Sequence, residues 1–385
     1  MSMSHRERVV RALNHEETDR VPVDFGGGPA TQIHPDAYER LLAHIGFDPE
    51  APRDGADVEG GRGEGQVIVP SEKVLQYFDI DVRGVYPRLA ESDTGVVIDD
   101  LSYTDEWGAT WSKADARAPY INVKGPLQQL VDTTPSALNT IDWPMPDDPS
   151  RIRGLREETL RLREQTDYAI VLNLGNTTFA LSQRLRGFAE LLEDLLLNPV
   201  FAAALMERVT DIVCSMAEAA VGSVADLIDG VSTADDLGIQ TQPFMHPDLY
   251  RKMVKPHHAR LAATVHRLTQ APMILHSDGA VRQLLPDLID AGIDVLNPVQ
   301  VNAEGMSPTE LNKEFGKDLC FWGGIDTQKV LPFGSPSDVA REVRNRIHDL
   351  GDGGGYVLAS VHNILAEVPP ENIVAMFETA TTEMV

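Results

Sequence analysis

The sequence predicts an α/β fold, a single (β/α)8 TIM barrel that spans residues 1–385. Short apolar runs alternate with longer segments of helical periodicity, as in a chain of strand–helix units. The runs are apolar at successive positions, which indicates strands of a parallel sheet that are buried on both faces. About eight such runs are present, whereas an open doubly wound sheet usually has about five to seven strands. We therefore expect the sheet to form a barrel.

The expected elements follow one another along most of the chain. The candidate strands are Val21–Phe25, Val82–Tyr86, Ala169–Gly175, Leu227–Ser232, Pro272–His276, Asp294–Pro298, Leu319–Gly324 and Tyr356–Ser360. Helices are expected at Phe188–Leu197, Pro199–Ala225, His246–Thr269, Ala280–Ala291, Ser335–Leu350 and Pro370–Thr381. Prolines at the first turns and glycines after the last turns mark several of these helix boundaries.

Two segments in the N-terminal part interrupt this alternation. Gly95–Lys113 alternates at period two around a turn at Glu106–Gly108, which predicts an inserted β-hairpin over one mouth of the barrel. Asp48–Gln66 is rich in glycine and charged residues and is expected to be a surface loop in an N-terminal extension. Within it, GRGEG at Gly61–Gly65 lacks the preceding strand and the following Lys-Ser/Thr of a phosphate-binding loop.

Composition and charge limit the partners and the location. The formal net charge is −26, so we expect no nucleic-acid partner. The charged N-terminus has no apolar signal core, and no apolar run is long enough for a membrane helix. Cys214 and Cys320 form no disulfide framework, which favours a reducing, cytoplasmic location. Apolar helix faces fit a monomer or a homodimer.

Three residues at strand ends form a candidate metal site. His276 and Asp278 are two residues apart on an extended chain and therefore point to the same side. His362 ends the eighth strand, which faces the fifth across the mouth of a barrel. These three side chains would leave one position of a metal ion open for substrate. Alternatively, the histidines bind only backbone or substrate, or the set is the facial triad of a non-haem iron oxygenase, which usually has an all-β scaffold.

Other polar residues follow nearly every strand, where a barrel enzyme holds its catalytic groups. The adjacent Asp235 and Asp236 could cap the next helix, bind a cation or act as acid and base. We expect catalytic roles for Asp235, Asp236, His276 and Asp326. The residues expected to bind substrate are Asp24, Asn173, Asn176, Asn297, Gln300, Gln328 and Asn363.

Several long motifs resemble one family. They are RERVVRALNHEETDRVPVDF, DDLGIQTQPFMHPDLYRKMVKPHHARL, HSDGAVRQLLPDLIDAGIDVLNPVQ, FWGGIDTQKVLPFGSP and GGGYVLASVHNILAEVPPENIVAMFE. In these motifs the chain resembles the uroporphyrinogen decarboxylase superfamily over nearly its whole length. It is most similar to the branch of corrinoid-dependent methyltransferases, which includes O-demethylases and methylcobalamin:coenzyme M methyltransferases.

The resemblance favours methyl transfer over decarboxylation. Decarboxylases of the family open with an Arg-rich run that holds substrate carboxylates, whereas Val23–Gly28 here contains no arginine. Asp79 or Asp81 corresponds in place to the decarboxylase aspartate. A substrate with many carboxylates also suits a protein of charge −26 poorly.

The resemblance also implies the cofactors. Zinc methyltransferases of the family use His-x-Cys and a second Cys where this chain has His276, Asp278 and His362. Zinc is therefore the implied metal, and the loss of both thiolates argues against a thiol substrate. A corrinoid (cobalamin) carried by a partner protein is implied as well. The expected function is methyl transfer between an aryl methyl ether or methylamine and that corrinoid, with a decarboxylase or a non-catalytic binding protein as alternatives.

Overall fold

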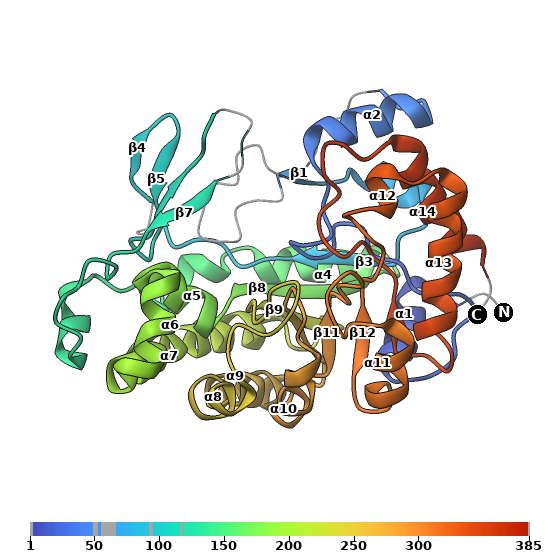
Figure 1. The fold of residues 1–385 in the computed structure, drawn as a ribbon. Helices are drawn as coiled ribbons and strands as arrows, with labels where there is room; N and C mark the ends of the chain where they lie inside the picture. The colour runs from blue at the N-terminus through green and yellow to red at the C-terminus, as the bar shows by residue number, and fades with distance from the viewer. Residues whose placement is uncertain are drawn as a thin grey trace.

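The computed structural model describes residues 3–48, 53–54, 67–91, 95–115, 118 and 120–383. Its centre is a curled parallel sheet of seven strands in the order β13-β12-β11-β10-β9-β8-β3 (Figure 1). The strands are β3 (Val82–Val85), β8 (Ala169–Asn176), β9 (Gly230–Ala234), β10 (Met273–His276), β11 (Val295–Asn297), β12 (Cys320–Trp322) and β13 (Tyr356–Val357). Each strand lies beside its neighbour in the chain, as in a TIM barrel. The expected α/β fold is confirmed.

The eighth expected strand, Val21–Phe25, is reduced to one bridge. Val23 pairs in parallel with Leu358, just beyond β13, and its carbonyl accepts a hydrogen bond from the amide of Asp81, just before β3. The segment therefore lies between the two edges of the seven-stranded sheet. Pro22 has no N–H group, which limits the ladder that this segment can form.

Helices cover the outer face of the sheet. After the N-terminal helices α1 (His5–Leu13), α2 (Pro35–Ile45) and α3 (Glu72–Tyr77), the helices between strands begin at α4 (Leu155–Gln165). They continue as α5 (Thr178–Arg186), α6 (Phe188–Leu197), α7 (Pro199–Val224), α8 (Pro247–Met253), α9 (Lys255–Leu268), α10 (Leu285–Asp290), α11 (Pro308–Phe315), α12 (Val330–Phe333), α13 (Pro336–Leu350) and α14 (Pro370–Thr382). Short 3₁₀ helices occur at Pro135–Thr140, Pro149–Ile152 and Arg282–Leu284. Within the described residues, no helix is both long and apolar enough to cross a membrane.

Several sequence-predicted boundaries were wrong, and three of them show the cause or the largest shift. The helix expected at His246–Thr269 is divided into α8 and α9 at Val254, because Pro256 in the first turn of α9 cannot continue a preceding helix. The helix expected at Ala280–Ala291 becomes α10 only from Leu285, with Pro286 in its first turn. The strand expected at Leu227–Ser232 begins later, at Gly230.

An antiparallel sheet of four strands is inserted between β3 and α4 (Figure 1). It consists of β4 (Val97–Asp99), β5 (Ser102–Thr104), β6 (Thr110–Ser112) and β7 (Ile121–Lys124). The predicted hairpin within Gly95–Lys113 is confirmed, and β7 adds a strand that was not predicted. The loop expected at Asp48–Gln66 lies largely outside the described residues, apart from Asp48 and the short strand β1 (Arg53–Asp54), which pairs with β2 (Ile68–Val69). Gly61–Gly65 lies wholly outside them.

The parallel strands are buried on both faces. Val171, Ile274 and Val295 belong to one apolar cluster, which also contains Val9 of α1. Met273 and Leu275, the neighbours of Ile274 along β10, belong instead to the larger cluster formed with the surrounding helices. Because successive side chains of a strand point to opposite faces, this division explains the continuous apolar runs.

Candidate metal centre and active-site cavity

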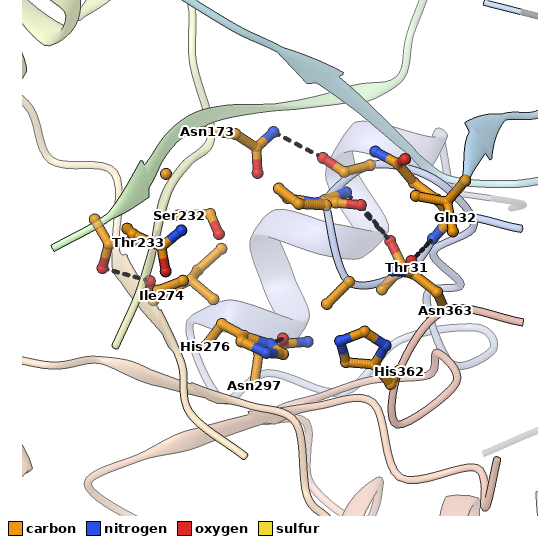
Figure 2. Close-up of a pocket in the computed structure, with 18 of the residues that line it drawn as sticks. Thr31, Gln32, Asn173, Ser232, Thr233, Ile274, His276, Asn297, His362 and Asn363 are labelled. Atoms are coloured by element: carbon orange, nitrogen blue, oxygen red, sulfur yellow. Dashed lines mark hydrogen bonds between the residues drawn. The ribbon is translucent and has the colours of Figure 1, made fainter. Parts of the chain in front are cut away.

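A cavity of about 350 Å³ lies at the carboxyl ends of the parallel strands (Figure 2). Its wall includes the last residues of four neighbouring strands, namely Asn176 of β8, Ala234 of β9, His276 of β10 and Asn297 of β11. Barrel enzymes hold their active sites at this end of the sheet, in the loops after the strands. The cavity is therefore the candidate active site.

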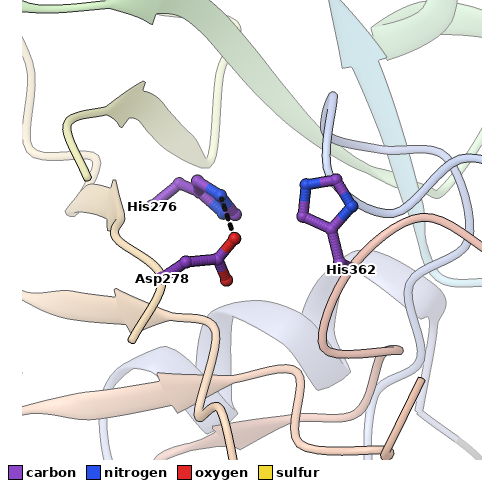
Figure 3. Close-up of side chains that lie close together, drawn as sticks. All are labelled: His276, Asp278 and His362. Carbon is purple, nitrogen blue, oxygen red and sulfur yellow. Dashed lines mark ion pairs between the residues drawn. The ribbon is translucent and has the colours of Figure 1, made fainter. Parts of the chain in front are cut away.

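His276 and His362 line this cavity, and Asp278, which does not line it, lies close to both (Figure 3). Each offers one ligand atom, and these atoms all lie within 4.8 Å of one another. His276 Nε2 lies 3.8 Å from Asp278 Oδ2, and the ring centres of His276 and His362 are 5.8 Å apart. Two imidazole nitrogens and a carboxylate oxygen are a donor set that zinc accepts in sites with an open position.

Two details of hydrogen bonding fit a bound cation. Asp278 Oδ1 is buried and has no hydrogen-bond partner in the described part of the chain, which is costly unless another group binds this oxygen. Asn297 Oδ1 accepts a hydrogen bond from His276 Nδ1 at 2.7 Å, so that the other ring nitrogen, Nε2, lies on the side of Asp278. Histidines that bind metals usually donate their second ring N–H in this way.

The surroundings of His362 favour its neutral form. Burial lowers the pKa of His362, the nearby carboxylate of Asp278 opposes this shift, and His276 lowers the pKa further. A histidine must be neutral to bind a metal ion through a ring nitrogen. The lowered pKa is therefore compatible with the predicted ligand role.

The adjacent acids Asp235 and Asp236 have different surroundings. Asp235 is fully buried, and its carboxylate accepts hydrogen bonds from the backbone amides of Phe179 and Ala180 in the first turn of α5 and from Thr177. His258 contacts the same carboxylate at 2.8 Å. Asp235 thus caps the preceding helix α5, whereas the sequence had suggested the following helix, and it does not line the cavity. Asp236 does line it.

Asp236 also lies beside the candidate metal ligands. Its Oδ1 is 4.0 Å from His276 Nε2 and accepts a hydrogen bond from the amide of Asp278 at 3.0 Å. Asp236 is therefore the member of the pair that can act on a ligand in the cavity.

Asp24 is an acid enclosed in the wall of the cavity. Its Oδ1 accepts a hydrogen bond from the amide of Gly27 at 2.8 Å, and its Oδ2 accepts one from Trp322 Nε1 at 3.0 Å. Burial raises the pKa of Asp24 to about 6, although these hydrogen bonds oppose the rise. Asp24 can therefore exchange a proton near neutral pH.

The other predicted site residues divide into two groups. Asn173, Asn176, Asn297 and Asn363 line the cavity with Asp24. Gln300, Asp326 and Gln328 do not. Gln300 accepts a hydrogen bond from the amide of Gly279, and Asp326 accepts hydrogen bonds from Asn302 and from the turn at Gln328 and Lys329. Their contacts fix the loops around the site.

Sequence reasoning missed most residues of the wall, among them three aromatic residues and one arginine that come from outside the parallel strands. Tyr103, Trp111 and Tyr120 reach the cavity from the inserted sheet or its connections, and Arg184 reaches it from α5. The alternating pattern of YTDEWGATW was a usable signal, because a hairpin over the mouth presents every second side chain to the cavity. Arg184 gave no signal, since charged residues on a helix are normally exposed to solvent.

Asp79 and Asp81 lie apart from the cavity. Asp81 is fully buried and forms ion pairs with Arg8 at 2.6 Å and Arg20 at 2.7 Å. Asp79 pairs with Arg20 and His5. Neither lines the cavity, so neither takes the position that a decarboxylase aspartate would need beside its substrate. Cys214 and Cys320 are both free and buried.

The curled parallel sheet carries, at the carboxyl ends of its strands, a cavity with polar side chains and three residues that could bind a metal ion. This arrangement is that of TIM-barrel-like α/β proteins. Within that class, residues 124–382 match the family described as uroporphyrinogen decarboxylase (URO-D). The match covers more than half of the chain, and the chain belongs to this family. The resemblance found in the sequence motifs is therefore confirmed at the level of the family.

Solved structures with a similar fold include a methyltransferase from Methanosarcina mazei. It is 18% identical, the match covers 99% of both chains, and the TM-score is 0.66. An endo-1,4-beta-xylanase from Penicillium canescens matches with 10% identity over 59% of this chain and 78% of its own, at a TM-score of 0.36. The first likeness shows a shared fold over the whole chain, whereas the second is too weak to support an argument. Among curated proteins, none matches this sequence.

Proposed function

We propose that this protein is an enzyme that moves a methyl group between a small methylated substrate and a corrinoid held by a partner protein. The methyl donor is of the aryl methyl ether or methylamine type. The observation that supports this most directly is the convergence of His276, Asp278 and His362 at a cavity of about 350 Å³. The shared fold with a methyltransferase is consistent with the proposal.

In this proposal the three side chains bind zinc. When bound, zinc would act as a Lewis acid on the ether oxygen or amine nitrogen of the substrate at its open position. Asn297 orients His276 through the 2.7 Å hydrogen bond, and His362 stays neutral because its pKa is lowered. Asp278 contributes a buried oxygen that otherwise has no partner in the described residues.

The transfer also needs a proton. For an ether, the carbon–oxygen bond breaks, and its electron pair stays on the oxygen, which then takes a proton. A corrinoid in the Co(I) state would supply the electron pair for the new bond to the methyl carbon. Asp24 lines the same cavity and has a pKa raised to about 6. It is our candidate for the group that supplies the proton.

A decarboxylase is the second candidate, because the family description names that activity. Two features disfavour it. Arg184 is the only Lys or Arg among the described residues of the cavity wall, so a substrate with several carboxylates would lack partners. Asp81 is paired with Arg8 and Arg20 away from the cavity.

The test is a methyl-transfer assay with a reduced corrinoid and a set of methylated ethers and amines. The reaction is monitored through the change in absorbance of the corrinoid. We expect turnover with zinc-loaded protein and a loss of at least roughly 100-fold in His276→Ala, because the metal ligand is removed. The decarboxylase alternative predicts carbon dioxide release from porphyrinogens without metal and little effect of His276→Ala. A non-catalytic protein would show neither activity, and that result would contradict the proposal.

A further inference from the structure

The inserted sheet supplies an aromatic wall to the cavity. Tyr103, Trp111 and Tyr120 all line it, together with His276 at the end of β10 and His362 after β13. The rings of Tyr103 and Trp111 are nearly parallel, with centres 6.5 Å apart, and Tyr120 meets Tyr103 edge-on at 4.9 Å. Trp111 is anchored because its Nε1 donates a hydrogen bond to Asp105 at 2.7 Å. Such a wall suits a flat aromatic substrate.

Arg184 is the positive charge at this wall. Its guanidinium carbon lies 4.9 Å from the ring centre of Trp111, a cation–π contact. Within the described ranges, no carboxylate forms an ion pair with this guanidinium and no acceptor receives a hydrogen bond from it. Asp105 is the nearby acid, but its oxygens already accept hydrogen bonds from Trp111 and from the amides of Trp107 and Ala109. The N–H donors of the Arg184 guanidinium therefore remain available to a ligand in the cavity.

An available guanidinium beside aromatic rings favours an anionic ligand. Arginine presents paired N–H donors in a plane that matches the two oxygens of a carboxylate. Partial burial strengthens that interaction over its value in water. A methylamine cation would instead be repelled. A cavity of about 350 Å³ is at the small end of ligand sites, which limits the ligand to about one ring.

We propose that Arg184 binds the carboxylate of a monocyclic aromatic acid whose methoxy group is the methyl donor. The aromatic wall of Tyr103, Trp111 and Tyr120 holds the ring, and Arg184 selects the acid over neutral ethers and amines. Only the role of the methoxy group as methyl donor rests on the proposed function. Recognition of the carboxylate by Arg184 is a separate property of the cavity.

The test is a calorimetric comparison of two probes, 4-methoxybenzoate and the uncharged 4-methoxybenzamide. Wild-type protein should bind the acid at least about 10-fold more tightly than the amide, a difference of about 1.4 kcal/mol. Arg184→Met should abolish this preference, and Arg184→Lys should retain part of it. The matched control is Arg208→Met, since Arg208 also contacts a tryptophan ring, that of Trp143, but does not line the cavity. Circular dichroism verifies that each variant is folded.

The outcomes separate this inference from the proposed function. Equal binding of the two probes by the wild-type protein, or an unchanged preference in folded Arg184→Met, would overturn the role of Arg184. If the acid binds through Arg184 but no methyl group reaches a corrinoid, the binding site stands and the proposed methyl transfer fails. If the wild-type protein and Arg184→Met both demethylate neutral ethers at the same rate as the acid, methyl transfer stands and this inference is wrong.

Discussion

His276 and Asn297 are paired across neighbouring strands, with His276 Nδ1 2.7 Å from Asn297 Oδ1. The two residues are register partners of β10 and β11, so the sheet itself fixes the orientation of the imidazole. The other ring nitrogen, Nε2, is thereby held on the side of Asp278. The register of β10 and β11 therefore helps to orient one side chain of the candidate metal centre.

Asn297→Ala should weaken zinc binding by about 10–100-fold, because His276 loses the partner that fixes its ring. Competition with a chromogenic chelator measures the affinity. Asn173→Ala is the control, since Asn173 also lines the cavity but donates its hydrogen bond to the carbonyl of Gly27. Equal zinc affinity in the wild-type protein and Asn297→Ala would show that this hydrogen bond does not support a metal ligand.

Asp235→Ala should lower the stability of the protein much more than Asp236→Ala. Loss of Asp235 leaves the buried His258 and the first turn of α5 without their acceptor, which should lower the free energy of unfolding by about 3–5 kcal/mol. Asp236 has a side chain that is 54% exposed, so its loss should change stability by less than about 1 kcal/mol. Urea denaturation measures both. Similar losses of stability in the two variants would contradict the distinct roles described for these acids.

Because the pKa of Asp24 is raised, the free energy of unfolding should fall as the pH rises. Since its pKa is about 6 in the native protein against an ordinary 3.8, the native state keeps a proton that the unfolded chain has released. Stability contributed by this group is therefore present below about pH 4 and lost as the pH rises through about 6. The loss is about 3 kcal/mol at about 1.4 kcal/mol per pKa unit.

Asp24→Asn removes this titration. From about pH 4 to about pH 7, the free energy of unfolding of the wild-type protein should therefore fall by about 3 kcal/mol relative to the variant. Urea denaturation at a series of pH values measures the difference. A difference that does not change with pH would show that Asp24 is ionised in the native state throughout this range.

The sheet could be predicted from sequence because its strands are apolar on both faces. Leu275 faces the helices and Ile274 the opposite side, which produces an unbroken run that is recognisable without a structure. Strand β7 was missed because it lacks this feature. Ile121 and Val123 on it alternate with polar residues and are 60% and 48% exposed, so the segment has no continuous apolar run.

The candidate site was predictable only in part. The spacing of His276 and Asp278 is a local property of an extended chain, and His362 follows another predicted strand, so the three could be grouped from the sequence. Asp235 and Asp236 are identical neighbours, and only the fold shows which one faces the cavity. The same holds for arginines of α5, because Arg186 pairs with Asp194 at 2.7 Å whereas Arg184 lines the cavity.

Metal content tests the central claim most directly. Wild-type protein, His276→Ala/His362→Ala and the control His44→Ala/His246→Ala would be purified, offered zinc at neutral pH and analysed by mass spectrometry. His44 and His246 are exposed and lie outside the cavity wall. We predict about one zinc ion per chain in the wild-type protein and the control, and none in the first double variant. Absence of zinc from the wild-type protein, or zinc retained without His276 and His362, would contradict the account.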